Sequence, residues 1–167
     1  MGRVTTTTTQ TPAAGLTTRP AAAGATYTIT LKAGLELLNS NQRLHHAPKG
    51  RRTRAIREAA MVAVSENEAL MAALAAAKPG PLFQRAHIFG IYHPATSGRC
   101  DPANWYPSFK AAVDGLVDAG LLDDDDHTRV IGPDMRLGCK VKGGRIALVV
   151  RGLEAGQDWP GFGAVAA

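Results

Sequence analysis

The chain has 167 residues and a mass of 17.5 kDa, which suits one domain built around a single hydrophobic core. Hydrophobic residues make up 45% of it, and no apolar run approaches the roughly 18 residues that span a bilayer, so the composition predicts a globular protein and excludes a membrane-spanning helix. A net charge of +5 favours a polyanionic partner, although basic charge alone also suits a membrane surface or solubility.

The first 25 residues are rich in threonine, alanine and proline and poor in large apolar side chains, so they predict a disordered tail. They contain no apolar signal-peptide core, and export is not expected. Cys100 and Cys139 form no CxxC pair and no metal-ligand spacing with histidine, which indicates reduced thiols in a cytoplasmic protein. We expect the folded domain to span residues 26–153 and a second tail to span 154–167.

The first half of this domain predicts a strand and one long helix. In Thr26 to Lys32 apolar and polar residues alternate, which is the period of a half-buried strand. A polar turn, "NSNQ", follows. From Thr53 to about Ala77 the residues are good helix formers, and the run ends at "KPGP".

The second half predicts three more strands around another helix. In Leu82 to Pro94 apolar and polar residues alternate again, which predicts a central strand. A helix should begin at Pro107, with apolar residues at helical spacing, and should end at a left-handed Gly120. "TRVIG" and "GRIALVVRGL" read as the last two strands. This order predicts a small α/β (α+β) domain with one mixed sheet and two main helices.

Four consecutive aspartates, residues 123–126, follow the second helix. Such a run is most often a solvated loop, but carboxylates are also the ligands that magnesium prefers. Asp101 lies before the same helix, and about thirteen helical residues would separate the two acidic points by roughly 20 Å. Unless the loop before the helix or the chain after it folds back, they cannot share one metal.

A basic stretch leads into the first helix and continues through its first residues. It can neutralise several phosphates with little dependence on sequence, although a solubilising helix start is the alternative. The adjacent His45 and His46 do not converge in a helix or a strand, so we infer no zinc site. Trp105 and Tyr106 are more typical of core packing than of stacking on a base. The stretch contains Arg43, Lys49, Arg51, Arg52, Arg54 and Arg57.

Taken in order, these segments resemble the RusA-like crossover junction endodeoxyribonucleases, which are Holliday junction resolvases common in phages and prophages. The likeness runs from about Thr26 to Leu153. "TYTITL" and "LNSNQRLHH" resemble the opening strand and asparagine-rich turn of that family, and "KGGRIALVV" resembles its last strand. "GRCDPANWYPSFKAAVDGLVDAGLLDDDD" is similar to its central signature, in which an Arg-Asp-x-Asp-Asn segment leads into a helix that carries a lysine and is followed by an acidic pair.

The resemblance implies roles for individual residues. Asp101 and Asn104 match the first aspartate and the asparagine of the signature, and Lys110 matches its lysine, four residues before Asp114. The acidic pair falls at Asp125 and Asp126, or one residue earlier with Asp124. The implied catalytic residues are therefore Asp101, Lys110, Asp125 and Asp126, and the implied metal ligands are Asp101, Asn104, Asp125 and Asp126.

One position departs from this signature, because Ala103 stands where the family has its second aspartate. The resemblance implies a homodimeric phosphodiesterase that uses Mg²⁺, or Mn²⁺, to cleave branched DNA. The alternative is a branched-DNA-binding protein with weak or lost cleavage, which Ala103 keeps open. The expected DNA-binding residues are Arg43, Lys49, Arg51, Arg52, Arg54 and Arg99.

Overall fold

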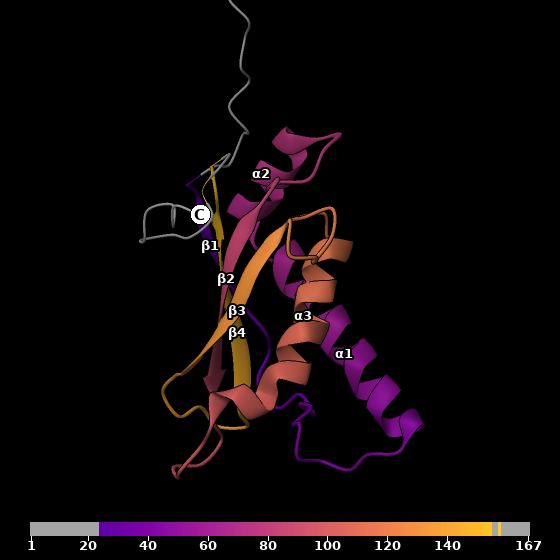
Figure 1. The fold of residues 1–167 in the computed structure, drawn as a ribbon, viewed down its shortest axis with the longest axis vertical. Helices are drawn as coiled ribbons and strands as arrows, with labels where there is room; N and C mark the ends of the chain where they lie inside the picture. The colour runs from indigo at the N-terminus through magenta and orange to yellow at the C-terminus, as the bar shows by residue number, and fades with distance from the viewer. Residues whose placement is uncertain (1–23, 155–156, 158–167) are drawn as a thin grey trace, which may run out of the picture.

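The computed structural model describes residues 24–154 and 157. In this part of the chain, four strands form one mixed sheet in the order β1-β4-β2-β3 (Figure 1). The strands are β1 (Thr26–Thr30), β2 (Ala86–His93), β3 (Val130–Leu137) and β4 (Arg145–Gly152). The predicted class, a small α+β domain with one mixed sheet, is confirmed. Most of the two predicted tails lies outside the described residues.

Both strand orientations occur in this sheet. β4 pairs antiparallel with β1 on one side and with β2 on the other, whereas β2 and β3 pair parallel. A parallel pair needs a long crossover connection, and the chain between β2 and β3 supplies it. That crossover contains the short 3₁₀ helix η1 (Pro102–Trp105) and the helix α3 (Tyr106–Asp118). The predicted helix from Pro107 is therefore the crossover of the sheet.

The helix predicted from Thr53 to Ala77 is two helices, α1 (His46–Ser65) and α2 (Glu68–Ala77), bent by 88°. The break falls at Asn67, whose side chain accepts a hydrogen bond from the Leu70 backbone N–H at 3.0 Å. Asparagine is a strong N-cap and a weak interior helix residue, so it starts a new helix there. The single-helix prediction was wrong because alanine and leucine on both sides concealed this cap.

Helices α1 and α3 cover one face of the sheet (Figure 1). The core between the two layers includes Ile29, Ile88, Leu148 and Phe109, each no more than 1% exposed. The ring of Phe109 lies directly over Gly90 of β2, where a Cβ atom would come within 2.7 Å of it. The absent side chain therefore allows α3 to lie close to the centre of the sheet.

In the described residues, no single helix is long and apolar enough to cross a bilayer. The bent pair α1 and α2 passes that test only when its two helices are counted together, by length and composition.

Candidate functional site on α3

Three charged side chains meet on the outer surface of α3. The Lys110 ammonium group donates a hydrogen bond to Asp114 Oδ1 at 2.6 Å and another to Asp125 Oδ2. Lys110 and Asp114 are one turn apart on the helix, whereas Asp125 comes from the following loop. We call Lys110, Asp114 and Asp125 the α3 cluster.

The end of α3 explains how Asp125 reaches the middle of the helix. Gly120 adopts φ +84°, its N–H donates to the Val117 carbonyl, and the Leu121 N–H donates to the Leu116 carbonyl. This is a Schellman motif, which reverses the chain at a helix end. Leu121 and Leu122 are then buried, at 0% and 2% exposure, and fix the start of the loop. The loop therefore returns beside α3 and places Asp125 against Lys110.

Electrostatics bind the α3 cluster together. The hydrogen bond from Lys110 lowers the pKa of Asp125 below its ordinary value, against an opposing effect of burial. Burial lowers the pKa of Lys110, but the hydrogen bonds to Asp114 and Asp125 outweigh it and raise that pKa overall. The Lys110 ammonium group thus lies between the carboxyl groups of Asp114 and Asp125.

The other aspartates of the run have separate roles. Asp126 Oδ1 accepts hydrogen bonds from the Thr128 backbone N–H and hydroxyl group, both at 2.6 Å, and these bonds lower the pKa of Asp126. Asp124 Oδ1 accepts from the Asp125 backbone N–H at 2.7 Å, while Asp123 is 55% exposed. The run is thus a hydrogen-bonded loop at Asp124 and Asp126 and a contributor to the α3 cluster at Asp125, while magnesium binding by the run stays a prediction.

Asp101 and Asn104 lie at the opposite end of α3, in and just before η1. Asp101 Oδ1 accepts from the Ala103 backbone N–H at 3.0 Å and caps η1. The Asn104 carbonyl accepts from the Ser40 backbone N–H at 2.7 Å. Within residues 24–154 no three His, Cys, Asp or Glu side chains are grouped closely enough to hold a metal ion. The four predicted ligands are therefore not gathered into one site.

A basic groove of about 580 Å³ runs along α1. Its residues follow one another at intervals of three and one positions in turn, so that every second one is four positions on, and they form a single stripe on the helix. Three of them, Lys49, Arg54 and Arg57, carry positive charge and are exposed. We call this stripe the α1 groove, and its lining consists of His46, Lys49, Gly50, Thr53, Arg54 and Arg57.

Arg57 connects the α1 groove to α3. Its guanidinium group donates two hydrogen bonds to the Asp118 carboxylate, one of them 2.5 Å long. This pair raises the pKa of Arg57 and lowers that of Asp118, and Asp114 and Asp125 also contribute to the shift of Arg57. The α3 cluster therefore lies within electrostatic reach of the α1 groove.

The remaining predicted DNA contacts lie outside the α1 groove. Arg43, Arg51 and Arg99 are exposed. Arg52 Nε donates to Glu36 at 3.2 Å, so this arginine ties α1 to the preceding loop. Trp105 stacks on Tyr92 with ring centroids 4.3 Å apart, which confirms core packing for its indole ring. Tyr106 is 47% exposed, so the prediction of core packing was wrong for this residue.

Sequence reasoning did not assign site roles to several charged residues. The i, i+4 spacing of Lys110 and Asp114 pointed to their contact, but nothing local pointed to Arg57 with Asp118. Buried His87 of β2 likewise contacts Asp134 of β3 at 2.7 Å, and that contact depends on the sheet register. Comparisons with known proteins add no candidates, since no protein-family model and no curated protein matches the chain.

We expect Lys110→Met to lower the free energy of unfolding at pH 7, because the variant leaves the Asp114 and Asp125 side chains facing each other without the ammonium group. The loss should be about 1 kcal/mol or less, because the lysine side chain is half exposed to solvent. Since the pKa of Asp125 is depressed in the folded protein, this contribution is present above about pH 4 and lost as the pH falls further. At the alkaline end, the same stabilising contribution is lost only at strongly alkaline pH, because the pKa of Lys110 is raised. Thermal unfolding of both proteins between pH 3 and 8 should show melting temperatures that converge at the acidic end.

Proposed function

We propose that the chain is a magnesium-dependent endodeoxyribonuclease that cleaves Holliday junctions or related branched DNA in the cytoplasm. The observation that carries this proposal is the α3 cluster, two carboxylates and a lysine, beside the basic α1 groove. The resemblance to RusA-like resolvases, with Lys110 and the acidic pair in the expected order, supports the same activity.

The donor atoms of the α3 cluster fit a magnesium ion. Mg²⁺ is usually held by one or two carboxylates, with water and phosphate oxygens in the other positions. Asp114 and Asp125 already face the same cation, Lys110, so they are the pair that would hold it. A bound magnesium ion supplies an activated water and neutralises charge on the scissile phosphate. Asp101, Asn104 and Asp126 stay predicted ligands, on the resemblance alone.

The chain's own residues would provide the rest of the chemistry. Lys49 and Arg54 in the α1 groove would hold backbone phosphates and bring DNA to α3 in spite of its aspartates. Arg57, fixed by Asp118, would position the strand at the end of that path. Lys110 would stabilise the negative charge that develops on the phosphate as the bond breaks.

The proposal is tested by incubating the full chain with an end-labelled synthetic four-way junction, with and without MgCl₂. We expect cuts near the branch point only with magnesium and no cutting of the matching linear duplex. Cleavage that is equal with EDTA, or equal on the linear duplex, would contradict it.

The second candidate is a branched-DNA-binding protein without efficient cleavage. Two observations favour it. Lys110 already neutralises both carboxylates of the α3 cluster, and Ala103 contributes only a backbone N–H where the related signature has an aspartate. Junction binding without cutting, in both Mg²⁺ and Mn²⁺, would select this function.

We expect the double change Lys49→Ala and Arg54→Ala to weaken binding to junction, fork and duplex DNA by similar factors. Each lost phosphate contact should also make the slope of log K against log salt shallower by up to about 0.9. Fluorescence anisotropy titrations at several salt concentrations measure both effects. Arg52→Ala is a suitable comparison, because Arg52 is bonded to Glu36. An unchanged slope in the double variant would place the α1 groove away from DNA.

We also propose that two copies act on one junction. A two-fold dimer presents two identical active sites to a symmetric substrate, as paired cuts require. Sedimentation should therefore report about twice 17.5 kDa. Mixing wild-type and Asp125→Asn subunits should yield junctions nicked in one strand. A protein that stays monomeric at high concentration with junction bound would rule out paired cutting.

A further inference from the structure

The edge of the sheet at β1 offers a surface that the proposed nuclease activity does not use. β1 is one of the two edge strands, and among the described strands it is bonded only to β4. Leu31 N–H donates to the Ile146 carbonyl, and the Ala25 carbonyl accepts from Gly152 N–H. Because backbone groups alternate sides along a strand, those of Thr26, Thr28 and Thr30 point away from the sheet. In residues 24–154 these three threonines have no bonding partner on that side, and all are exposed.

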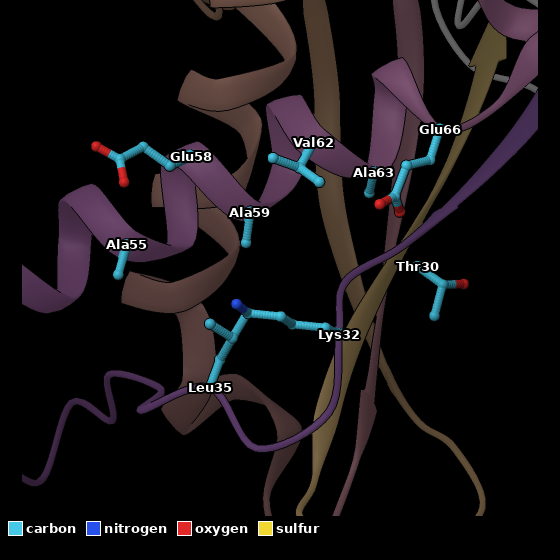
Figure 2. A pocket seen from close by; sticks show the side chains of 9 residues that line it. All are labelled: Thr30, Lys32, Leu35, Ala55, Glu58, Ala59, Val62, Ala63 and Glu66. Carbon is cyan, nitrogen blue, oxygen red and sulfur yellow. The ribbon is translucent and has the colours of Figure 1, made fainter.

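A groove of about 290 Å³ lies next to this edge, between the end of β1 and α1 (Figure 2). Its floor is made of small or apolar side chains, and Val62 is 52% exposed there. The floor residues are Leu35, Ala55, Ala59, Val62 and Ala63. We call it the β1 groove. An exposed strand edge beside an apolar groove is the arrangement that accepts an added strand, whose backbone pairs with the edge while alternate side chains fill the groove.

The rim of the β1 groove carries charge. Glu58 and Glu66 lie along α1 at the rim, and Lys32 extends across the groove from the end of β1 (Figure 2). Neither glutamate makes an ion pair within the described part of the chain, although the protein as a whole carries a net charge of +5. With one lysine against two glutamates, the rim has an excess of negative charge and complements a basic side chain.

We propose that the β1 edge and the β1 groove bind an extended peptide segment of a partner protein. The segment adds as a strand beside β1, with an apolar side chain in the groove and a lysine or arginine nearby on the same face, opposite Glu58 or Glu66. Side chains two residues apart share one face of a strand, so one short segment provides both.

A second copy of this chain fits the surface less well. If its own β1 paired with the first β1, the side chains facing the helices would be Ile29 and Leu31, which are 1% and 0% exposed in the core of that copy. They could not enter the β1 groove. The side chains of an independent peptide are not already buried in a core of their own, so one apolar side chain can enter the β1 groove.

A synthetic probe tests this inference on the full chain. The probe is an acetylated, amidated octapeptide of alternating threonine and valine, with a lysine in place of one valine, and a matched peptide carries glutamine at that position. We expect the probe to slow exchange of the outward-facing amide hydrogens of Thr28 and Thr30, followed by NMR. Exchange of the Ile29 amide, which faces β4, should not change. Unchanged exchange at Thr28 and Thr30 with millimolar probe would overturn the proposal.

Three variants test separately the backbone pairing with β1, the apolar contact in the β1 groove and the ion pair at its rim. Thr28→Pro removes an outward N–H, which an edge strand tolerates, and should weaken the probe about tenfold. Val62→Arg blocks the β1 groove at an exposed position and provides the same test if the proline variant does not fold. Glu66→Gln should weaken the lysine peptide about two- to fivefold and leave the glutamine peptide unchanged. Equal effects on both peptides would exclude the ion pair.

The same measurements distinguish a partner peptide from a second copy of this chain at the β1 edge. If Thr28 and Thr30 are already protected without probe, and Thr28→Pro turns a dimer into a monomer, the edge binds a second copy and the peptide proposal is wrong.

Discussion

Replacing Asp125 with asparagine is expected to reduce the proposed magnesium-dependent junction cleavage by at least about a hundredfold, the scale on which a group that stabilises a transition state acts. Asp125 is the one member of the aspartate run that contacts Lys110. The change keeps the shape of the side chain and removes its charge, so the position loses its affinity for a cation. Cleavage and gel-shift assays on one preparation should show intact or tighter junction binding, because a carboxylate near phosphate is gone.

Asp123→Asn is the matched control, since Asp123 belongs to the same run but is largely exposed. Its ion pair with Arg129 is long, at 4.0 Å. It should cleave at nearly the wild-type rate. Full activity in Asp125→Asn would remove this residue from the site, and equal losses in both variants would mean that the charge of the whole loop matters instead. Asp126→Asn and Asp101→Asn, expected from the resemblance to abolish cutting, show whether those residues join the α3 cluster when DNA is bound.

Replacing Gly115 with alanine is expected to lower the free energy of unfolding by about 1 to 3 kcal/mol, the usual cost of overpacking a tight contact. A Cβ atom at Gly115 would come within 2.4 Å of the Arg57 carbonyl oxygen and 2.9 Å of Ala60 Cβ. Both atoms belong to α1, so the two helices would have to separate. Urea denaturation should measure the loss, and DNA binding should weaken as Arg57 moves from Asp118.

Gly50→Ala is the control for this change. Gly50 lies in α1 with no atom within 4 Å of its would-be Cβ, so alanine there should stabilise the protein by about 0.5 to 1 kcal/mol through helix propensity alone. Opposite signs for the two glycines would show that α1 and α3 pack as closely as described. A neutral Gly115→Ala would contradict that packing.

Local sequence patterns predicted the type and order of most helices and strands. Alternation around Ile29 and around Ile88 predicted β1 and β2, and helical spacing with the Gly120 cap predicted α3 to within about one turn. These signals are local, because side-chain period and helix capping depend on neighbours along the chain. The same locality explains the error at Asn67, where helix formers on both sides outweighed a single capping residue.

The contacts between charged side chains depend on the tertiary fold. Lys110 and Asp125 are fifteen residues apart and Arg57 and Asp118 sixty-one, and no sequence period relates either pair. The first contact exists because the chain reverses after Gly120 and buries Leu121, and the second because Gly115 lets α1 approach α3. The edge position of β1 among the described strands likewise follows from strand order, which depends on pairing across the whole domain. The run of four aspartates could therefore be read from the sequence, but its division into one residue of the α3 cluster and three of the loop could not.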